Sequence, residues 1–113
     1  MKRGEIEKNL ETTFSGFTKE DLPTGVDMIA GKVRDIFDLG NELLIVTSDR
    51  ISAFDRVLTT IPFKGQVLNG MSNYWFDVTG DILPNHIRTK LTSRSVIVSR
   101  GEVLPVAVVV RGY

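Results

Sequence analysis

The sequence contains no cysteine and only one histidine, His86. The absence of cysteine excludes disulfide bonds and thiolate metal sites. A single histidine also excludes a histidine-rich metal cluster, and its setting in Pro-Asn-His-Ile-Arg predicts an exposed side chain. We therefore assign no metal-ligating residue to this chain.

The sequence also lacks an excess of charge and a long apolar run. Fourteen basic residues balance fourteen acidic ones, so no long-range field exists to collect nucleic acid. No apolar stretch approaches the roughly 18 residues of a membrane span. The N-terminus, Met-Lys-Arg-Gly-Glu-Ile-Glu-Lys, has no apolar region typical of a secretory signal. We expect a cytoplasmic domain with neither nucleic-acid nor membrane partners.

The patterns that are present indicate an α+β domain. Strand patterns occupy residues 26–38 (one strand or two, with a hinge at Gly31-Lys32), 43–47, 56–61, 95–99 and 103–111. Short turns join neighbouring strands, which favours a mainly antiparallel sheet with one packed helix. We assign residues 26–113 to this domain. Residues 1–25, a short helix and a turn-rich connector, form an N-terminal extension without a predicted function.

Residues 66–78 carry the strongest helical pattern. The apolar residues of this segment fall on one stripe, which predicts that they face the core: Val67, Leu68, Met71, Trp75 and Val78. Gly80 is expected to end the helix.

The C-terminal run, residues 103–111, is strongly apolar and β-branched apart from Pro105. It predicts a central strand that pairs with residues 95–99 across the turn at 100–102. Because such a strand is usually followed by a return connection, we expect the chain to be truncated. An apolar face left open in this way favours self-association, so a homo-oligomer is expected.

The stretch from Leu43 to Asp55 joins a buried strand to a polar loop. Hydroxyls, carboxylates and a guanidinium follow the apolar residues within a few positions, and such a loop is a common place for a ligand site. The alternative is a capped turn, in which Ser48 and Asp49 accept backbone hydrogen bonds and Arg50 pairs with Asp55. The residues alone leave both interpretations open.

Gly31-Lys32-Val33-Arg34 places two cations beside a glycine on a predicted strand. A glycine lets backbone amides approach a phosphate, and the two cations could add charge-assisted hydrogen bonds. The pattern differs from the phosphate-binding loop Gly-x-x-x-x-Gly-Lys-Ser/Thr. Exposed cations on an edge strand are the alternative interpretation.

Four segments together resemble one enzyme family in order and spacing. They are Gly31-Lys32-Val33-Arg34-Asp35-Ile36-Phe37, Thr47-Ser48-Asp49-Arg50-Ile51-Ser52-Ala53-Phe54-Asp55, Ile61-Pro62-Phe63-Lys64-Gly65, and Leu104-Pro105-Val106 through Val110-Arg111-Gly112-Tyr113. The family is phosphoribosylaminoimidazole-succinocarboxamide synthase, or SAICAR synthetase, of purine biosynthesis. The resemblance covers residues 29–113, and Asp-Arg-Ile-Ser-Ala-Phe-Asp is its most specific block.

This resemblance implies an ATP-dependent, magnesium-assisted ligase. It joins the carboxylate of carboxyaminoimidazole ribonucleotide to the amine of L-aspartate, through an acyl phosphate. The implied fold is a small antiparallel lobe like the ATP-covering lobe of protein kinases. The ATP-binding residues that it implies are Gly31, Lys32, Val33, Arg34, Arg100, Val103 and Leu104. The implied substrate-binding residues are Asp49, Arg50, Ser52, Asp55, Lys64 and Arg111.

Two departures from the family pattern stand out. Ala107 occupies the position after Pro105-Val106 where the family usually has glutamate. The family chain is also well over twice this length, and its magnesium-binding Asp-x-Lys-x-Glu-Phe-Gly block is absent here. The resemblance therefore implies an N-terminal lobe that is inactive alone, and we assign no catalytic residue. A non-catalytic nucleotide-binding module or a structural fragment is the alternative.

Overall fold

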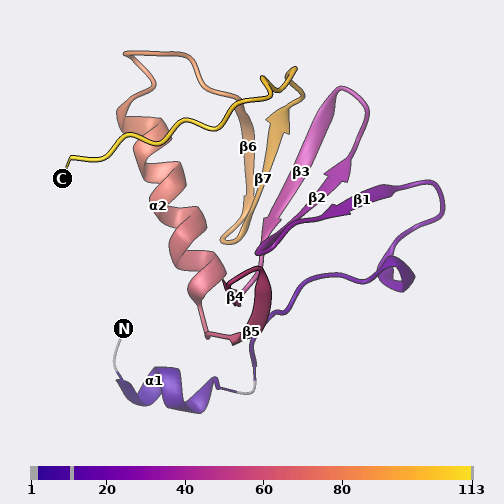
Figure 1. Cartoon of the computed structure of the whole chain (residues 1–113), viewed down its shortest axis with the longest axis vertical. Helices are drawn as coiled ribbons and strands as arrows, with labels where there is room; N and C mark the ends of the chain where they lie inside the picture. The colour runs from indigo at the N-terminus through magenta and orange to yellow at the C-terminus, as the bar shows by residue number, and fades with distance from the viewer. Residues whose placement is uncertain (1–2, 11, 113) are drawn as a thin grey trace.

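The structure is a computed structural model that describes residues 3–10 and 12–112, except for the side chain of residue 6. Tyr113, the last residue of the fourth motif, lies outside the described residues. Figure 1 shows a twisted sheet with one long helix, α2 (Lys64–Val78), beside it and a short helix, α1 (Arg3–Lys8), apart from the main body. A single 3₁₀ turn, η1 (Lys19–Asp21), precedes the first strand.

The described residues contain seven strands in two antiparallel sheets, which confirms the α+β class. The larger sheet has the order β1-β2-β3-β7-β6 and the smaller pairs β4 with β5. The strands are β1 (Asp27–Ala30), β2 (Arg34–Asp38), β3 (Glu42–Thr47), β4 (Arg50–Ala53), β5 (Arg56–Thr60), β6 (Ile87–Thr92) and β7 (Ser95–Ser99). The predicted β2–β3 hairpin is confirmed, with Ile36 opposite Ile45.

The predicted hinge at Gly31-Lys32 is confirmed, since two strands, β1 and β2, flank it. Two other strand predictions need correction. The motif Gly31-Lys32-Val33-Arg34 does not lie on a strand, because its first three residues form the turn and only Arg34 lies in β2. The polar loop after β3 contains a strand, β4, because it pairs with β5 across a two-residue turn. Phe54 and Asp55 hold this turn with φ values of 50° and 63°, as a tight hairpin requires.

The core of the larger sheet is divided between its two faces. Asp35 and Phe37, two residues apart on β2, lie on the same face of the sheet. There the Phe17 ring lies edge-on to the Phe37 ring, with centroids 5.4 Å apart. The opposite face carries Val96 and Val98 toward α2. A cavity of about 170 Å³ between this face and α2 is lined by residues that include Arg34, Ile45, Asn73, Phe76, His86 and Val96.

Helix α2 (Lys64–Val78) forms where the sequence predicts a helix, but its apolar stripe faces outward. Val67, Leu68, Met71, Trp75 and Val78 are all exposed, Trp75 to 59%. The buried residues of the helix are Gly65 and Asn69, and Asn69 donates to the Ser93 carbonyl at 3.1 Å. Helical periodicity identified an amphipathic helix correctly, but the prediction that the stripe is core was wrong. Within the described part of the chain, no helix has the length and apolar character to cross a membrane.

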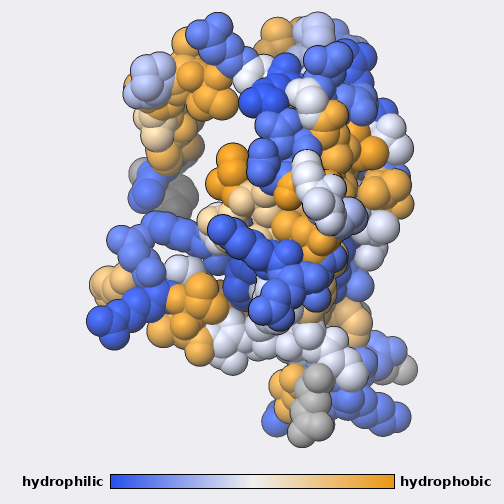
Figure 2. All heavy atoms as spheres, turned by 90° about the vertical axis from the view of Figure 1, so that its right-hand side faces the viewer, coloured by the Kyte–Doolittle hydropathy of each residue, from blue (hydrophilic) through white to orange (hydrophobic). Residues whose placement is uncertain are grey.

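The predicted C-terminal strand is also absent. Residues 100–112 have no regular secondary structure, and β7 pairs with β3 and β6 instead. Val103, Leu104 and Val110 are highly exposed. In Figure 2 a thin, largely apolar arm stands away from the body at the height of this segment. A β-branched run becomes a strand only beside a partner, and no described strand pairs with this one.

We predict that Trp75→Lys changes the free energy of unfolding by less than about 0.5 kcal/mol, as at other exposed positions. It should also reduce the binding of a hydrophobic dye, because it interrupts the exposed stripe. Urea denaturation at a concentration where the chain is monomeric measures the first effect and dye fluorescence the second. Val98→Ala, at a buried position, is the control and should cost about 2 kcal/mol. A loss of that size for Trp75→Lys would place the stripe in the core after all.

Candidate functional site

The candidate site begins where β3 ends. Thr47, Ser48 and Asp49 are all buried, although each carries a polar side chain. Both the backbone N–H and the hydroxyl of Ser48 donate to the Val33 carbonyl, at 2.9 and 2.8 Å. The start of the loop is therefore buried, and the hydrogen bonds of Ser48 fix it to the β1–β2 turn.

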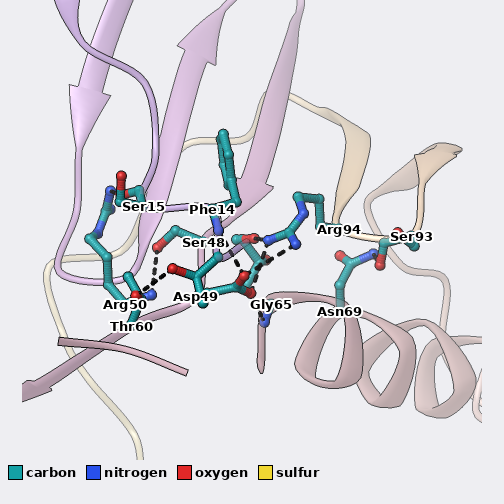
Figure 3. A network of polar contacts seen from close by, with 12 residues as sticks. Phe14, Ser15, Ser48, Asp49, Arg50, Thr60, Gly65, Asn69, Ser93 and Arg94 are labelled. Atoms are coloured by element: carbon teal, nitrogen blue, oxygen red, sulfur yellow. Dashed lines mark hydrogen bonds and ion pairs between the residues drawn. The ribbon is translucent and has the colours of Figure 1, made fainter. Parts of the chain in front are cut away.

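Asp49 accepts hydrogen bonds from three separate segments. The backbone N–H groups of Phe14 and Gly65 donate to its carboxylate at 2.9 and 2.8 Å, and Arg94 adds contacts of 3.1 and 3.4 Å. Figure 3 shows these groups gathered around Asp49, with Gly65 at the start of α2. A Cβ at Gly65 would lie 2.3 Å from the Thr47 carbonyl oxygen, so only glycine permits this approach.

Burial raises the pKa of the Asp49 carboxyl, but the hydrogen bonds and charge around it act more strongly in the other direction. Arg94 and the N–H groups of Phe14 and Gly65 all favour the ionised form, so the net effect is a pKa below the usual range. The Arg94 guanidinium also lies over the Phe14 ring, 5.0 Å from its centroid. Asp49 is therefore an ionised internal anchor.

Arg50 forms a second buried pair, with Asp35. Its Nη2 lies 2.9 Å from Asp35 Oδ1, and the Asp35 side chain is fully buried. The other contacts of the guanidinium are to backbone carbonyls: Nε to Lys32 at 3.2 Å, Nη2 to Gly31 at 3.2 Å and Nη1 to Ser15 at 2.7 Å. These contacts, with one from Nη1 to Asp35 Oδ2 at 3.4 Å, engage every nitrogen of the guanidinium.

Arg50 and Ser48 together hold the turn between β1 and β2. They bind the carbonyl groups of Gly31, Lys32 and Val33, three residues in succession. These carbonyls therefore face the body of the protein, while the Lys32 side chain is exposed and pairs with Asp55. The Lys32 and Val33 N–H groups have no partner among residues 3–10 and 12–112.

The remaining predicted site residues lie in five places. Arg34 lines the cavity beside α2, Ser52 is half-buried on β4, and Lys64 begins α2. Arg100 donates to both oxygens of Asp38, at 2.8 and 2.6 Å, near the opposite end of β2 from Gly31. The exposed C-terminal segment carries Val103, Leu104 and Arg111.

The capped-turn interpretation is correct for Asp49, which accepts from two backbone N–H groups. Ser48 mainly donates, and it accepts one 3.4 Å contact from the Arg50 N–H. The interpretation named the wrong partner for Arg50. Arg50 pairs with Asp35, while Asp55 pairs with Lys32. Sequence reasoning also missed Arg94. A buried aspartate requires a cation, which is a signal for such a residue, but the pattern did not say which cation would meet it.

Asp49→Asn should lower the free energy of unfolding at pH 7 by about 3 kcal/mol, because it leaves Arg94 without its buried partner. The folded-state pKa of Asp49 is lowered, so its contribution is present above the unfolded value of about 3.9 and lost as the pH falls through the folded value. The gap between wild type and variant should therefore narrow below about pH 4. Urea midpoints across this pH range measure it.

Asp81→Asn, at an exposed loop position, provides the control and should change stability little at any pH. An Asp49→Asn gap that stays constant from neutral to acidic pH would contradict ionisation of Asp49 as its cause.

Comparisons with known proteins show which family the sequence and the fold belong to. The family model described as SAICAR synthetase matches residues 27–113. The phosphoribosylaminoimidazole-succinocarboxamide synthase of Syntrophotalea carbinolica is 50% identical over 109 residues, which cover 82% of this chain and 37% of that protein. The chloroplastic synthase of Arabidopsis thaliana is 43% identical over 117 residues, covering 99% of this chain and 28% of that one.

A solved structure, SAICAR-synthase from Saccharomyces cerevisiae complexed with SAICAR, superposes with a TM-score of 0.64 at 30% identity. The match covers 75% of this chain and 37% of that one. The chain thus spans about a third of the length of the relatives it matches. Since the family model extends over most of the sequence and includes all four quoted motifs, the chain belongs to the SAICAR synthetase family.

Proposed function

We propose that this chain supplies the ATP-binding side of an ATP-dependent ligase of purine biosynthesis. The ligase joins carboxyaminoimidazole ribonucleotide to L-aspartate and produces SAICAR. The names of the relatives support the reaction, and the motifs that resemble the family lie, apart from Tyr113, in the described part of the chain. A cytoplasmic location and a homo-oligomeric state stay predictions of this proposal.

The observation that carries the proposal is the orientation of the β1–β2 turn. Its three successive carbonyls are held inward by Ser48 and Arg50, so the turn presents its Lys32 and Val33 N–H groups and the Lys32 ammonium on the outside. Successive free N–H groups beside a cation form an anion-binding surface. We therefore assign the ATP phosphates to Gly31, Lys32 and Val33, with Arg34 beside them.

The chemistry explains why such a surface is needed. A carboxylate is a poor electrophile because its oxygen is a poor leaving group, and phosphorylation converts that oxygen into a good one. Cations and N–H groups must stabilise the charge on the transferring phosphoryl group. The Lys32 ammonium is suited to this, because it is exposed and has only another exposed side chain, Asp55, as its partner.

Substrate binding is assigned to groups of the site that are not already saturated. Ser52, Asp55 and Lys64 are half-buried or exposed, and they remain candidates for contact with the ribonucleotide or aspartate. Asp49 and Arg50 instead position the loop, since their polar atoms are occupied internally. Arg111 is proposed for a phosphate or carboxylate, and the segment with Arg100, Val103 and Leu104 for adenine.

The residues that the structure describes do not form a magnesium site by themselves. No group of three or more acidic or histidine side chains that could hold a metal occurs within the described ranges. The carboxylates nearest the turn, Asp35 and Asp55, are paired with Arg50 and Lys32. A requirement for magnesium therefore rests on the chemistry of the family.

Lys32→Ala tests the phosphate assignment. We use a chimera in which this chain replaces the matching part of the Syntrophotalea carbinolica relative. ATP-dependent turnover should fall at least about a hundredfold, which corresponds to about 2.7 kcal/mol of transition-state stabilisation. The free energy of unfolding, measured by urea denaturation, should change by less than about 0.5 kcal/mol, because the Lys32–Asp55 pair is exposed.

Lys90→Ala is the matched control, since Lys90 is also a partly exposed lysine that pairs with an aspartate, Asp77. It should leave both turnover and stability near wild type. Turnover of Lys32→Ala within about threefold of the Lys90→Ala value would exclude Lys32 as a phosphate contact.

A further inference from the structure

The segment from Thr13 to Phe17, which we term the strap, lies outside the residues that the family model matches. It nevertheless contacts the candidate site at several points. The Thr13 hydroxyl hydrogen bonds with that of Thr60 at 2.5 Å, and Phe14 and Asp49 exchange hydrogen bonds of 2.9 and 2.8 Å. The Phe17 N–H donates to Asp35 Oδ2 at 3.0 Å.

The centre of the strap lies directly against the Arg50–Asp35 pair. The Ser15 carbonyl accepts from Arg50 Nη1 at 2.7 Å, the shortest contact of that guanidinium. A Cβ at Gly16 would lie 2.1 Å from Arg50 Nη1 and 2.5 Å from Asp35 Oδ2. Gly16 also has a φ of 115°, which side-chain-bearing residues rarely adopt. The strap can therefore close over the pair only with glycine at this position.

Through Arg50 the strap reaches the turn at Gly31–Val33. The Arg50 guanidinium binds the strap and Asp35, and it also binds the carbonyl groups of Gly31 and Lys32. Removing the Ser15 contact leaves a donor of a nearly buried guanidinium without a partner, which costs free energy. Arg50 would then move to recover a hydrogen bond and would take the turn carbonyls with it.

We propose that the strap is a positioning element for the anion-binding turn, with Gly16 as its determining residue. It fixes Arg50, which orients the carbonyls of Gly31 and Lys32 inward and thereby keeps the N–H groups of the turn directed outward. The affinity for the phosphates of ATP depends on this orientation. The inference rests on the proposed function for its ligand, whereas its mechanical part does not.

The test is Gly16→Ala in the same chimera, with Gly25→Ala as the matched control. Both glycines have positive φ, 115° and 89°, so alanine is strained at each. Only the Gly16 Cβ meets other atoms, because nothing lies within 4 Å of a Cβ at Gly25. A difference between the two variants therefore reports the contact with Arg50 and Asp35 and not backbone strain.

Two readouts are taken on each variant. Residue-resolved amide hydrogen exchange without ligand follows the Gly31 N–H, which donates to the Arg34 carbonyl, and the Ser48 N–H, which donates to Val33. Steady-state kinetics separates KM for ATP from kcat. For Gly16→Ala we expect faster exchange at both amides and a KM for ATP raised at least about tenfold, with kcat within about threefold.

The outcomes distinguish this inference from the proposed function. Exchange equal to that of Gly25→Ala overturns the inference whatever the kinetics show. Faster exchange with an unchanged KM overturns the link between strap and ligand, whereas failure of the ligase proposal appears in the Lys32→Ala test. If Gly16→Ala does not fold, Phe17→Ala provides the second variant. It loosens the strap from Phe37 without adding an atom near Arg50, and it should change both readouts in the same direction by a smaller amount.

Discussion

Two buried carboxylates, Asp35 and Asp49, dictate how the segments of this protein meet. Neither side chain has access to water, so the burial of each carboxylate is costly unless a cation and further donors pair with it. Asp35 has Arg50, and Asp49 has Arg94. Because Asp35, the adjacent pair Asp49 and Arg50, and Arg94 come from three separate parts of the sequence, satisfying the two carboxylates fixes β2, the junction between β3 and β4 and the β6–β7 turn relative to one another.

The same requirement explains why an N-terminal segment belongs to the site. Each carboxylate accepts a backbone N–H from the strap, Asp49 from Phe14 and Asp35 from Phe17. The rings of these two residues also lie edge-on to each other, with centroids 5.1 Å apart. The Phe17 ring lies edge-on to Phe37 of β2 as well. Backbone hydrogen bonds and aromatic packing thus act together on one short segment, although its sequence has no feature of a ligand-binding motif.

The sequence predicted the parts of the fold that depend on local patterns. The β2–β3 hairpin follows from two apolar runs around a turn, and α2 follows from helical periodicity. Periodicity cannot say which partner an apolar stripe will meet, and this is why the exposure of Trp75 was not predicted. The segment at 103–111 failed for a related reason, since strand pairing is decided by a partner and not by the run itself.

The sequence predicted several residues of the candidate site but not what each of them does. Ser48 and Arg50 hold the β1–β2 turn and Asp55 pairs with Lys32 there, whereas Arg100 and the C-terminal motif lie elsewhere. Asp49 and Arg50 are occupied by internal contacts. Their partners lie 45 and 15 positions away in sequence, at Arg94 and Asp35. Pairing over such distances depends on the sheet order, which places β7 beside β3.

The magnitudes of the two kinds of ion pair decide which cation is free to bind an anion. Separating Arg50 from Asp35 would leave a buried charge unpaired, at a cost of about 3–5 kcal/mol. Lys32 and Asp55 are 68% and 80% exposed, and a pair of that kind contributes about 0–1 kcal/mol. A phosphate can therefore displace Asp55 from Lys32 at little cost, whereas it cannot displace Asp35 from Arg50. The guanidinium, despite its better geometry for phosphate, is committed to the fold, and the lysine beside it remains available for the ligand.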